Sequence, residues 1–230
     1  MTQKRTEALV PAPVDEPDWK QRAVERSTRA AKLRAEQRVQ RFLDAAQAII
    51  TEKGTIDFTV QEVVDRSRQS LRSFYQHFDG KHDLLLALFE DALRRATTQI
   101  AAAAGAQLDP VEALRTSVQL LFELSRPDPG ARRPLFTEFA PRLLLAHPAE
   151  VRRAHLPLLD LLTDLTAASA QAGQLRAGTE PRRIAAIIME TVMFSAHASG
   201  GPGADSDGAG PRPVTADEIW DFIAHGITGP

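Results

Sequence analysis

The chain has 230 residues, of which 43% are hydrophobic, and a formal net charge of −2 at pH 7, which is typical of a soluble protein of one or two domains. The absence of cysteine excludes disulfides, thiolate zinc sites and cysteine nucleophiles. No apolar run approaches the roughly 18 residues of a membrane span, and the N-terminus lacks the apolar core of a signal peptide, so we expect a cytoplasmic protein.

Charge is distributed unevenly along the chain. Residues 1–81 hold 15 Lys/Arg and 12 Asp/Glu, whereas residues 82–230 hold 13 and 18. The excess of basic residues is concentrated between Lys20 and Arg41, where eight of them accompany only Glu25 and Glu36. Such a segment indicates either polyanion binding or an ordinary solvated face of a charged helix.

The N-terminal part of the chain begins with a proline-rich stretch. Residues 1–18 contain three prolines and scattered charges, which predicts a disordered leader. Residues 19–37 permit a helix but show little apolar periodicity, so we interpret them either as a basic arm that orders on DNA or as a continuation of the first helix. That first helix is predicted at Glu36–Lys53 and ended by Gly54. Its apolar stripe consists of Phe42, Ala45, Ala46, Ile49 and Ile50.

Two short helices joined by a tight turn are predicted next. Thr59 and Glu62 have the spacing of a capping box, which places the start of the first short helix at Thr59. Ser70 is a suitable N-cap for the second short helix, Leu71–Gln76. This layout is that of a helix-turn-helix, in which the second helix lies in the major groove of DNA.

The second short helix carries side chains suited to bases and to phosphates. The forked donors of Arg72 suit guanine, whereas Gln69 and Gln76 suit adenine. Hydroxyl, imidazole and ammonium groups nearby suit phosphate oxygens. The predicted DNA-binding residues are Thr59, Arg68, Gln69, Ser70, Leu71, Arg72, Ser73, Tyr75, Gln76, His77 and Lys81. Phe74 and Phe78 are instead predicted to be core residues that hold this helix in place.

The remainder of the chain keeps a helical pattern, and no strand signature competes with it. Proline opens most of the candidate helices, where its missing N–H costs nothing. The first candidate begins after Gly80 and runs to about Ala104. The others are Pro110–Arg126, Pro134–Ala146, Pro148–Ala172, Pro181–Ser199 and Thr215–Ile227, and a polar loop is predicted at Gly200–Pro213. We therefore expect an all-α fold of nine or ten helices.

Residues 36–90 resemble the TetR family of bacterial transcriptional regulators. The resemblance rests on Thr59, Ser70, Phe74-Tyr75-Gln76-His77-Phe78, Lys81 and Leu84-Leu85. It implies an N-terminal extension at 1–35, a three-helix DNA-binding domain at 36–80, and a ligand-binding and dimerisation domain at 81–230. The family usually has Ala-Gly-Val where this chain has Ser67-Arg68-Gln69. A left-handed Arg68 would cost about 1 kcal/mol relative to glycine. Either Arg68 and Gln69 offset this cost by contacts with phosphates or bases, or the substitution is tolerated and has no DNA role.

The same resemblance implies a homodimeric repressor that a small hydrophobic ligand releases from a palindromic DNA operator. The ligand would be a fatty acyl group, a sterol-like molecule or a drug-like molecule. The alternatives are a ligand-independent dimeric regulator whose body binds a protein partner, and an activator. The predicted dimer interface is Ile184, Ile187, Ile188, Thr191, Val192, Trp220 and Ile223, and the alternative is that these helices are merely buried. The predicted ligand pocket is Phe122, Phe136, Phe139, Leu143, Leu159, Leu162, Met189 and Met193, and each of these is equally interpretable as core.

Motifs of enzymes are not found in the sequence. It contains no nucleophile elbow, phosphate loop or dinucleotide fingerprint. Its six histidines are scattered and lack the paired spacing of a metal site. We therefore expect neither catalysis, nor a cofactor, nor a bound metal ion.

Overall fold

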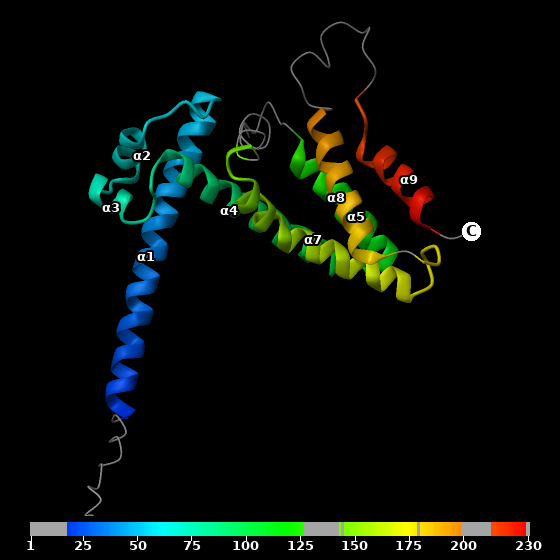
Figure 1. Ribbon diagram of the computed structural model, residues 1–230, viewed down its shortest axis with the longest axis horizontal. Coiled ribbons are helices and arrows are strands. Elements are labelled where there is room, and N and C mark those ends of the chain that lie inside the picture. The colour runs from blue at the N-terminus through cyan, green and yellow to red at the C-terminus, as the bar shows by residue number, and fades with distance from the viewer. Residues whose placement is uncertain (1–17, 127–142, 144, 179, 199–212, 229–230) are drawn as a thin grey trace, which may run out of the picture. The chain divides into compact units, whose positions relative to one another are not determined.

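The protein is described here by a computed structural model, which describes residues 18–126, 143, 145–178, 180–198 and 213–228 (Figure 1). This part of the chain contains eight helices, and its only β-structure is an isolated bridge between Leu175 and Thr228. The helices are α1 (Asp18–Lys53), α2 (Val60–Ser67), α3 (Leu71–Tyr75), α4 (Lys81–Ala104), α5 (Pro110–Ser125), α7 (Pro148–Gln171), α8 (Pro181–Ala198) and α9 (Ala216–Ile227). The all-α prediction is confirmed. None of these eight helices combines the length and apolarity that crossing a membrane requires.

Helix α1 is longer than the sequence pattern predicts, because it begins at Asp18 and not at Glu36. No glycine or proline interrupts the segment from Asp18 to Lys53, and an ion pair of 3.9 Å joins Lys32 to Glu36 across one turn. In the structure, residues 19–37 therefore continue the first helix, which is one of the two interpretations given above. The predicted leader lies outside the described residues apart from Asp18.

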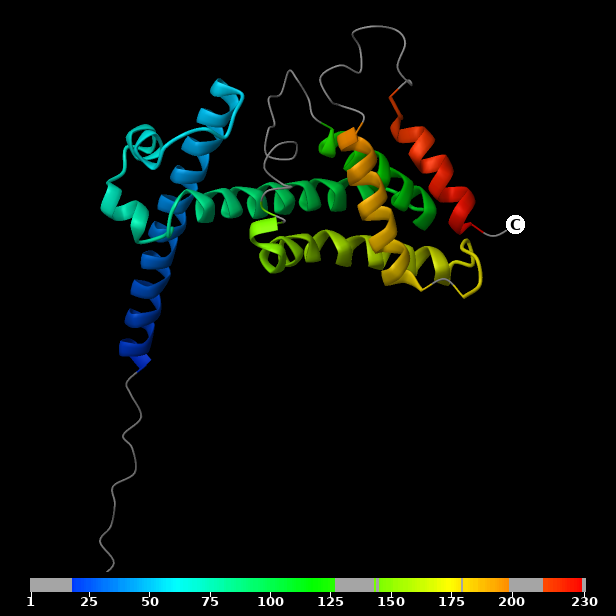
Figure 2. The same ribbon diagram turned by 45° about the horizontal axis from the view of Figure 1, so that its top comes forward.

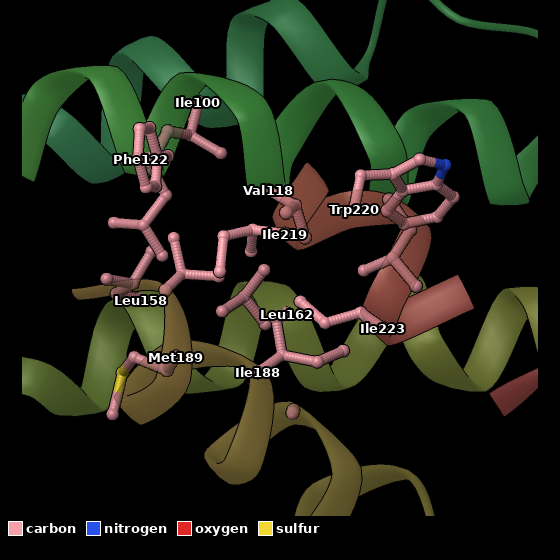
Figure 3. Packing of buried hydrophobic residues seen from close by; sticks show 14 of the residues in the cluster. Ile100, Val118, Phe122, Leu158, Leu162, Ile188, Met189, Ile219, Trp220 and Ile223 are labelled. Atoms are coloured by element: carbon pink, nitrogen blue, oxygen red, sulfur yellow. The ribbon is translucent and has the colours of Figure 1, made fainter. Parts of the chain in front are cut away.

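The chain divides into two compact units, residues 1–41 and residues 42–230. In the second unit, α4 packs against α7, and α5 contacts α4, α7, α8 and α9 (Figures 1 and 2). These five helices surround one hydrophobic cluster, whose side chains interdigitate in Figure 3. Its labelled members include Ile100, Phe122, Leu158, Leu162, Ile188 and Trp220. The cluster gives this part of the chain a core of its own.

Several predicted boundaries agree with the structure to within one residue. Proline occupies the first turn of α5 and α7, and the side chain of Thr215 caps α9 by accepting a hydrogen bond from the N–H of Glu218 at 3.2 Å. The predicted helix Pro134–Ala146 lies outside the described residues except for Leu143, Leu145 and Ala146. The predicted loop Gly200–Pro213 lies outside them except for Pro213.

Candidate nucleic-acid interface

The start of α2 is fixed by the capping box that the sequence predicts. The Thr59 hydroxyl accepts a hydrogen bond from the N–H of Glu62 at 3.2 Å, and the Glu62 carboxylate accepts one from the N–H of Thr59 at 2.7 Å. Lys53, in the last turn of α1, donates to the same carboxylate at 2.5 Å. The hydrogen bonds from Lys53 and from the Thr59 backbone lower the pKa of Glu62 from its ordinary 4.5 to about 2.

Replacing Glu62 by glutamine is expected to lower stability at neutral pH and to change its dependence on acid. Because folding lowers the pKa of Glu62, its stabilising contribution is complete above about pH 4.5 and is lost as the pH falls toward 2. Urea unfolding at several pH values should therefore show a gap between wild type and Glu62→Gln at pH 7 that narrows below pH 4.5. Glu190→Gln, at an exposed position of α8, is the matched control. A gap independent of pH would contradict the linkage.

The turn between α2 and α3 depends on Arg68. Its backbone angles are φ 55° and ψ 36°, and it is the only non-glycine residue with positive φ in the described part of the chain. Its N–H points to the carbonyls of Asp65 and Val64, and the N–H of Gln69 donates to Val64 at 3.2 Å. These bonds satisfy carbonyls that the end of α2 leaves open. The expected left-handed conformation of Arg68 is confirmed, and its side chain is exposed.

Replacing Arg68 by glycine is expected to raise stability and lower DNA affinity together. Glycine removes about 1 kcal/mol of left-handed strain. If the guanidinium contacts a phosphate, its loss also reduces the slope of log affinity against log salt by about 0.9 per contact. Thermal unfolding and salt titrations of DNA binding measure the two effects. The control is Arg68→Gln, which removes the charge but keeps the strain. Unchanged affinity and slope in both variants would contradict a DNA role for Arg68.

Helix α3 is held against the rest of its unit by aromatic rings. Ser70 caps it by accepting a hydrogen bond from the N–H of Ser73 at 3.0 Å. Phe74 is completely buried, and its ring centroid lies 5.5 Å from that of Phe42 and 5.3 Å from that of Phe78. The predicted core role of Phe74 and Phe78 is confirmed. With one side fixed in this way, α3 can present only its opposite side to a partner.

Seven of the eleven predicted DNA-binding residues are exposed, and four of these, Leu71, Arg72, Tyr75 and Gln76, lie in α3 or directly after it. The exposed members of the predicted set are Thr59, Arg68, Ser70, Leu71, Arg72, Tyr75 and Gln76. Leu71 is 43% exposed and Tyr75 is 57% exposed, so both side chains are accessible to a partner. Arg72 and Gln76 lie one turn apart, as two readers of successive bases require. The geometry therefore suits a short helix entering a DNA groove.

Four members of the predicted set are partly buried. The Ser73 Oγ and the His77 Nε2 atoms are buried and have no hydrogen-bond partner among the described residues. The Lys81 ammonium lies 4.8 Å from the centroid of the Phe58 ring, and Gln69 donates to the carbonyl of Arg68 at 3.2 Å. In this structure the Oγ of Ser73 and the Nε2 of His77 are not presented to a partner. Ser73 and His77 are therefore not used as DNA contacts in the function proposed below.

A second exposed surface lies on α8 and α9. The two helices line an apolar groove, in which Ile187 is 52% exposed and Phe222 is 72% exposed. Phe194, also on α8, is 75% exposed. The groove is lined by Ile184, Ile187, Ile188, Thr191, Asp221, Phe222, Ile223, His225, Gly226 and Ile227. Of the predicted interface residues, Val192 and Trp220 do not line it, and Ile188, Val192, Trp220 and Ile223 are buried in the chain's own core. Four of the seven predicted interface residues are thus buried in the single chain, and the dimer interface stays a prediction.

The predicted ligand-pocket residues fall into the core or outside the described residues. Phe122, Leu162 and Met189 belong to the hydrophobic cluster of Figure 3, with Leu159 and Met193 packed against it. Leu143 is buried as well. Phe136 and Phe139 lie outside the described residues. Phe122, Leu159, Leu162, Met189 and Met193 pack together as core, and a role of the predicted set in lining a ligand cavity remains a prediction.

Comparison with known proteins finds a family match for the DNA-binding segment and several similar structures. Residues 42–88 match the family described as bacterial regulatory proteins, tetR family, and the comparison with curated proteins found no match. The fatty acid degradation regulator FadR from Bacillus halodurans is similar in structure, with a TM-score of 0.64, 17% identity, and coverage of 82% of this chain and 95% of that one. FadR from Bacillus subtilis, solved in complex with stearoyl-CoA, has a TM-score of 0.59 and 15% identity, with coverage of 81% of this chain and 98% of that one. AibR, solved with isovaleryl coenzyme A and operator DNA, has a TM-score of 0.53 and 18% identity, with coverage of 84% of this chain and 99% of that one.

Proposed function

We propose that this chain, a DNA-binding regulator of the TetR family, acts as a homodimeric repressor that a small hydrophobic ligand releases from a palindromic operator. The observation that carries the proposal is the exposed side of α3, with Leu71, Arg72, Tyr75 and Gln76 presented by a helix fixed from behind by Phe74. Arg72 and Gln76 would read base edges, and the C5-methyl of thymine suits Leu71. Tyr75, Thr59 and Arg68 would donate to phosphates.

The homodimer is supported by the apolar surface on α8 and α9. Phe194 and Phe222 together with Ile187 place large apolar side chains in solvent, which a single chain has no physical reason to do. Pairing of this surface with a second copy of itself gives a closed two-fold dimer. Two α3 helices related by that axis require an operator whose half-sites are related by the same symmetry.

The ligand is proposed from the chemistry of similar proteins. Two proteins with similar structures were solved with acyl-coenzyme A molecules, stearoyl-CoA and isovaleryl-CoA. Among the three ligand classes that the sequence suggests, these examples favour an acyl group. Such a ligand would release the repressor only if it bound more tightly to the conformation that does not fit DNA.

Selection of bound DNA from a random duplex library, with the purified full-length protein, tests the proposal. We expect an inverted repeat whose half-sites are centred about ten base pairs, or a multiple of that distance, apart. Acyl-CoA thioesters of increasing chain length are then added to the complex, and both DNA release and melting temperature are recorded. Recovery of no preferred sequence would contradict the proposed function.

The alternative of a ligand-independent regulator is supported by the packing of three predicted pocket residues, Phe122, Leu162 and Met189, in one cluster (Figure 3). The melting temperature, measured with and without ligand, distinguishes the ligand-released repressor from the ligand-independent regulator. A ligand that binds the native state at 100 times its dissociation constant adds about 2.7 kcal/mol to stability and so raises the melting temperature. If no acyl-CoA raises the melting temperature or releases DNA, the ligand-independent function is the better description.

A further inference from the structure

The part of α1 before Phe42 has an uneven distribution of charge around its axis. Its three acidic residues, Asp18, Glu25 and Glu36, are seven and eleven residues apart. At about 3.6 residues per turn these spacings align all three along one line of the helix. The opposite side therefore contains no acidic residue, although the helix is exposed along most of its length.

Basic side chains occupy the side that lacks acids. Arg34, Arg38 and Arg41 follow one another at four- and three-residue spacing, and Lys20 precedes Arg38 by 18 residues, which is about five full turns. These four residues define the basic face of α1. Arg34 and Arg41 are exposed and Arg38 is half-buried. No ion pair within the described ranges involves any of the three arginines.

Small residues separate the two ends of the basic face. Ala23, Ser27, Ala30 and Ala31 lie on this side of the helix between Lys20 and Arg34. Short side chains here let the helix axis approach a partner closely. From Lys20 to Arg41 the face is about 31 Å long at a rise of 1.5 Å per residue. It consists of three arginines within about 11 Å along the helix axis and of Lys20 about 21 Å before them.

The other basic residues of this segment have different surroundings. Arg22, Arg26 and Arg29 lie beside the line of acids, so that side of the helix carries both signs of charge. The Nε of Arg26 also donates to the carbonyl of Arg22 at 3.2 Å. These three arginines provide a comparison set with the same number of charges in a mixed environment.

The pattern favours a nucleic acid over a membrane as the partner. Membrane-surface helices need a continuous apolar side, and the large apolar side chains here do not form one. Trp19 and Leu33 share a side of the helix, whereas Val24 points away from it. Each of the three is more than half exposed. A row of arginines without an apolar side instead fits the phosphate backbone of duplex DNA, which carries one charge per about 1.7 Å of its axis.

We propose that the basic face of α1 binds the phosphate backbone of the DNA that flanks the half-site contacted by α3. The proposal rests on the proposed function, because α3 must first bring the chain to DNA. Helix α1 runs without interruption from Asp18 to Lys53, so the basic face is covalently joined to the DNA-binding segment and is held at high local concentration near the duplex. Contacts of this kind add affinity and salt dependence and lengthen the DNA that the protein covers, but they read no sequence.

Two full-length triple variants test the inference. R34Q/R38Q/R41Q removes three charges from the basic face, and R22Q/R26Q/R29Q removes three from the mixed side. Glutamine is a good helix former, so both variants should keep wild-type helicity by circular dichroism. A third variant, R34K/R38K/R41K, keeps the charge of the basic face. Affinity for a 40-base-pair duplex centred on the selected operator is measured against salt concentration, with a duplex trimmed to the two half-sites as a second probe.

We expect the basic-face variant to reduce the slope of log affinity against log salt by about 2 to 3 per bound chain, at about 0.9 per phosphate contact. The mixed-side variant should change the slope by less than one unit, and the lysine variant should keep the wild-type slope. The loss should be smaller on the trimmed duplex. These results together would support the inference.

Other outcomes overturn it in recognisable ways. Equal losses in the two glutamine variants would assign the effect to total charge and not to the basic face. A basic-face variant that binds like wild type, while Arg72→Ala no longer binds, would refute this inference and leave the proposed function intact. Stronger dependence on the basic face for binding to phosphatidylserine vesicles than to DNA would identify a membrane as the partner. Failure of the wild-type chain to prefer any duplex would refute the proposed function itself.

Discussion

Replacing Phe222 by glutamate is expected to convert the protein from a dimer to a monomer of 25.2 kDa and to abolish tight operator binding. The phenyl ring is 72% exposed in the single chain and lines the apolar groove of α8 and α9. In the proposed dimer both copies of the ring are buried, and each contributes about 1.5–3 kcal/mol. A carboxylate at the same place would have to be buried without a partner, which costs several kcal/mol more.

The loss of the dimer should be visible in DNA binding. Two linked DNA-binding segments bind a two-half-site operator roughly 10² to 10⁴ times more tightly than one segment does. Phe222→Glu should lose this factor while keeping its fold, because the side chain it replaces lies largely in solvent. Sedimentation velocity and operator titrations measure the two effects.

The control for this variant is Leu108→Glu. Leu108 is fully exposed in the turn between α4 and α5 and does not line the groove. It receives the same new charge and should remain a dimer with wild-type operator affinity. A Phe222→Glu protein that still sediments as a dimer would place the interface elsewhere on the chain.

Local rules of sequence were sufficient to predict the DNA-binding segment. The capping boxes at Thr59 and Thr215 and the N-cap at Ser70 depend on residues no more than three positions apart, and all three are found in the structure. The left-handed conformation of Arg68 was expected from the resemblance instead, because the family usually has glycine at that position. Features fixed by neighbours in sequence can be inferred from sequence alone.

The exposed apolar side chains of α8 and α9 could not be inferred in the same way. Helix α8 is apolar on more than one side: Ala185, Ile188 and Val192 pack inside the chain, whereas Ile187 and Phe194 face solvent. Periodicity identifies apolar positions but does not say which side meets the core, since that depends on helices distant in sequence. The N-terminal part of α1 illustrates the opposite case. It has little apolar periodicity, so its helical extent was underestimated.

Replacing Phe74 by alanine is expected to destabilise the protein by about 3–5 kcal/mol and to eliminate DNA binding. Phe74 is completely buried and its ring packs edge-to-face against Phe42, with Phe78 at 5.3 Å. Helix α3 has only five residues, too few to be stable without such packing. Removal of the ring leaves a cavity under α3 and releases the side that presents Arg72 and Gln76.

The neighbouring residue provides the control that separates stability from binding. Tyr75 lies on the same helix and its ring meets that of Phe74 at 5.4 Å, but it is 57% exposed. Tyr75→Ala should therefore cost much less stability than Phe74→Ala, and still weaken DNA binding through the loss of its phosphate donor. Chemical denaturation and operator titration of both variants should show that stability depends mainly on Phe74, whereas affinity depends on both residues. A Phe74→Ala protein of wild-type stability that binds DNA normally would show that α3 is not held by this aromatic cluster, and the orientation of the whole DNA-reading side would then need another cause.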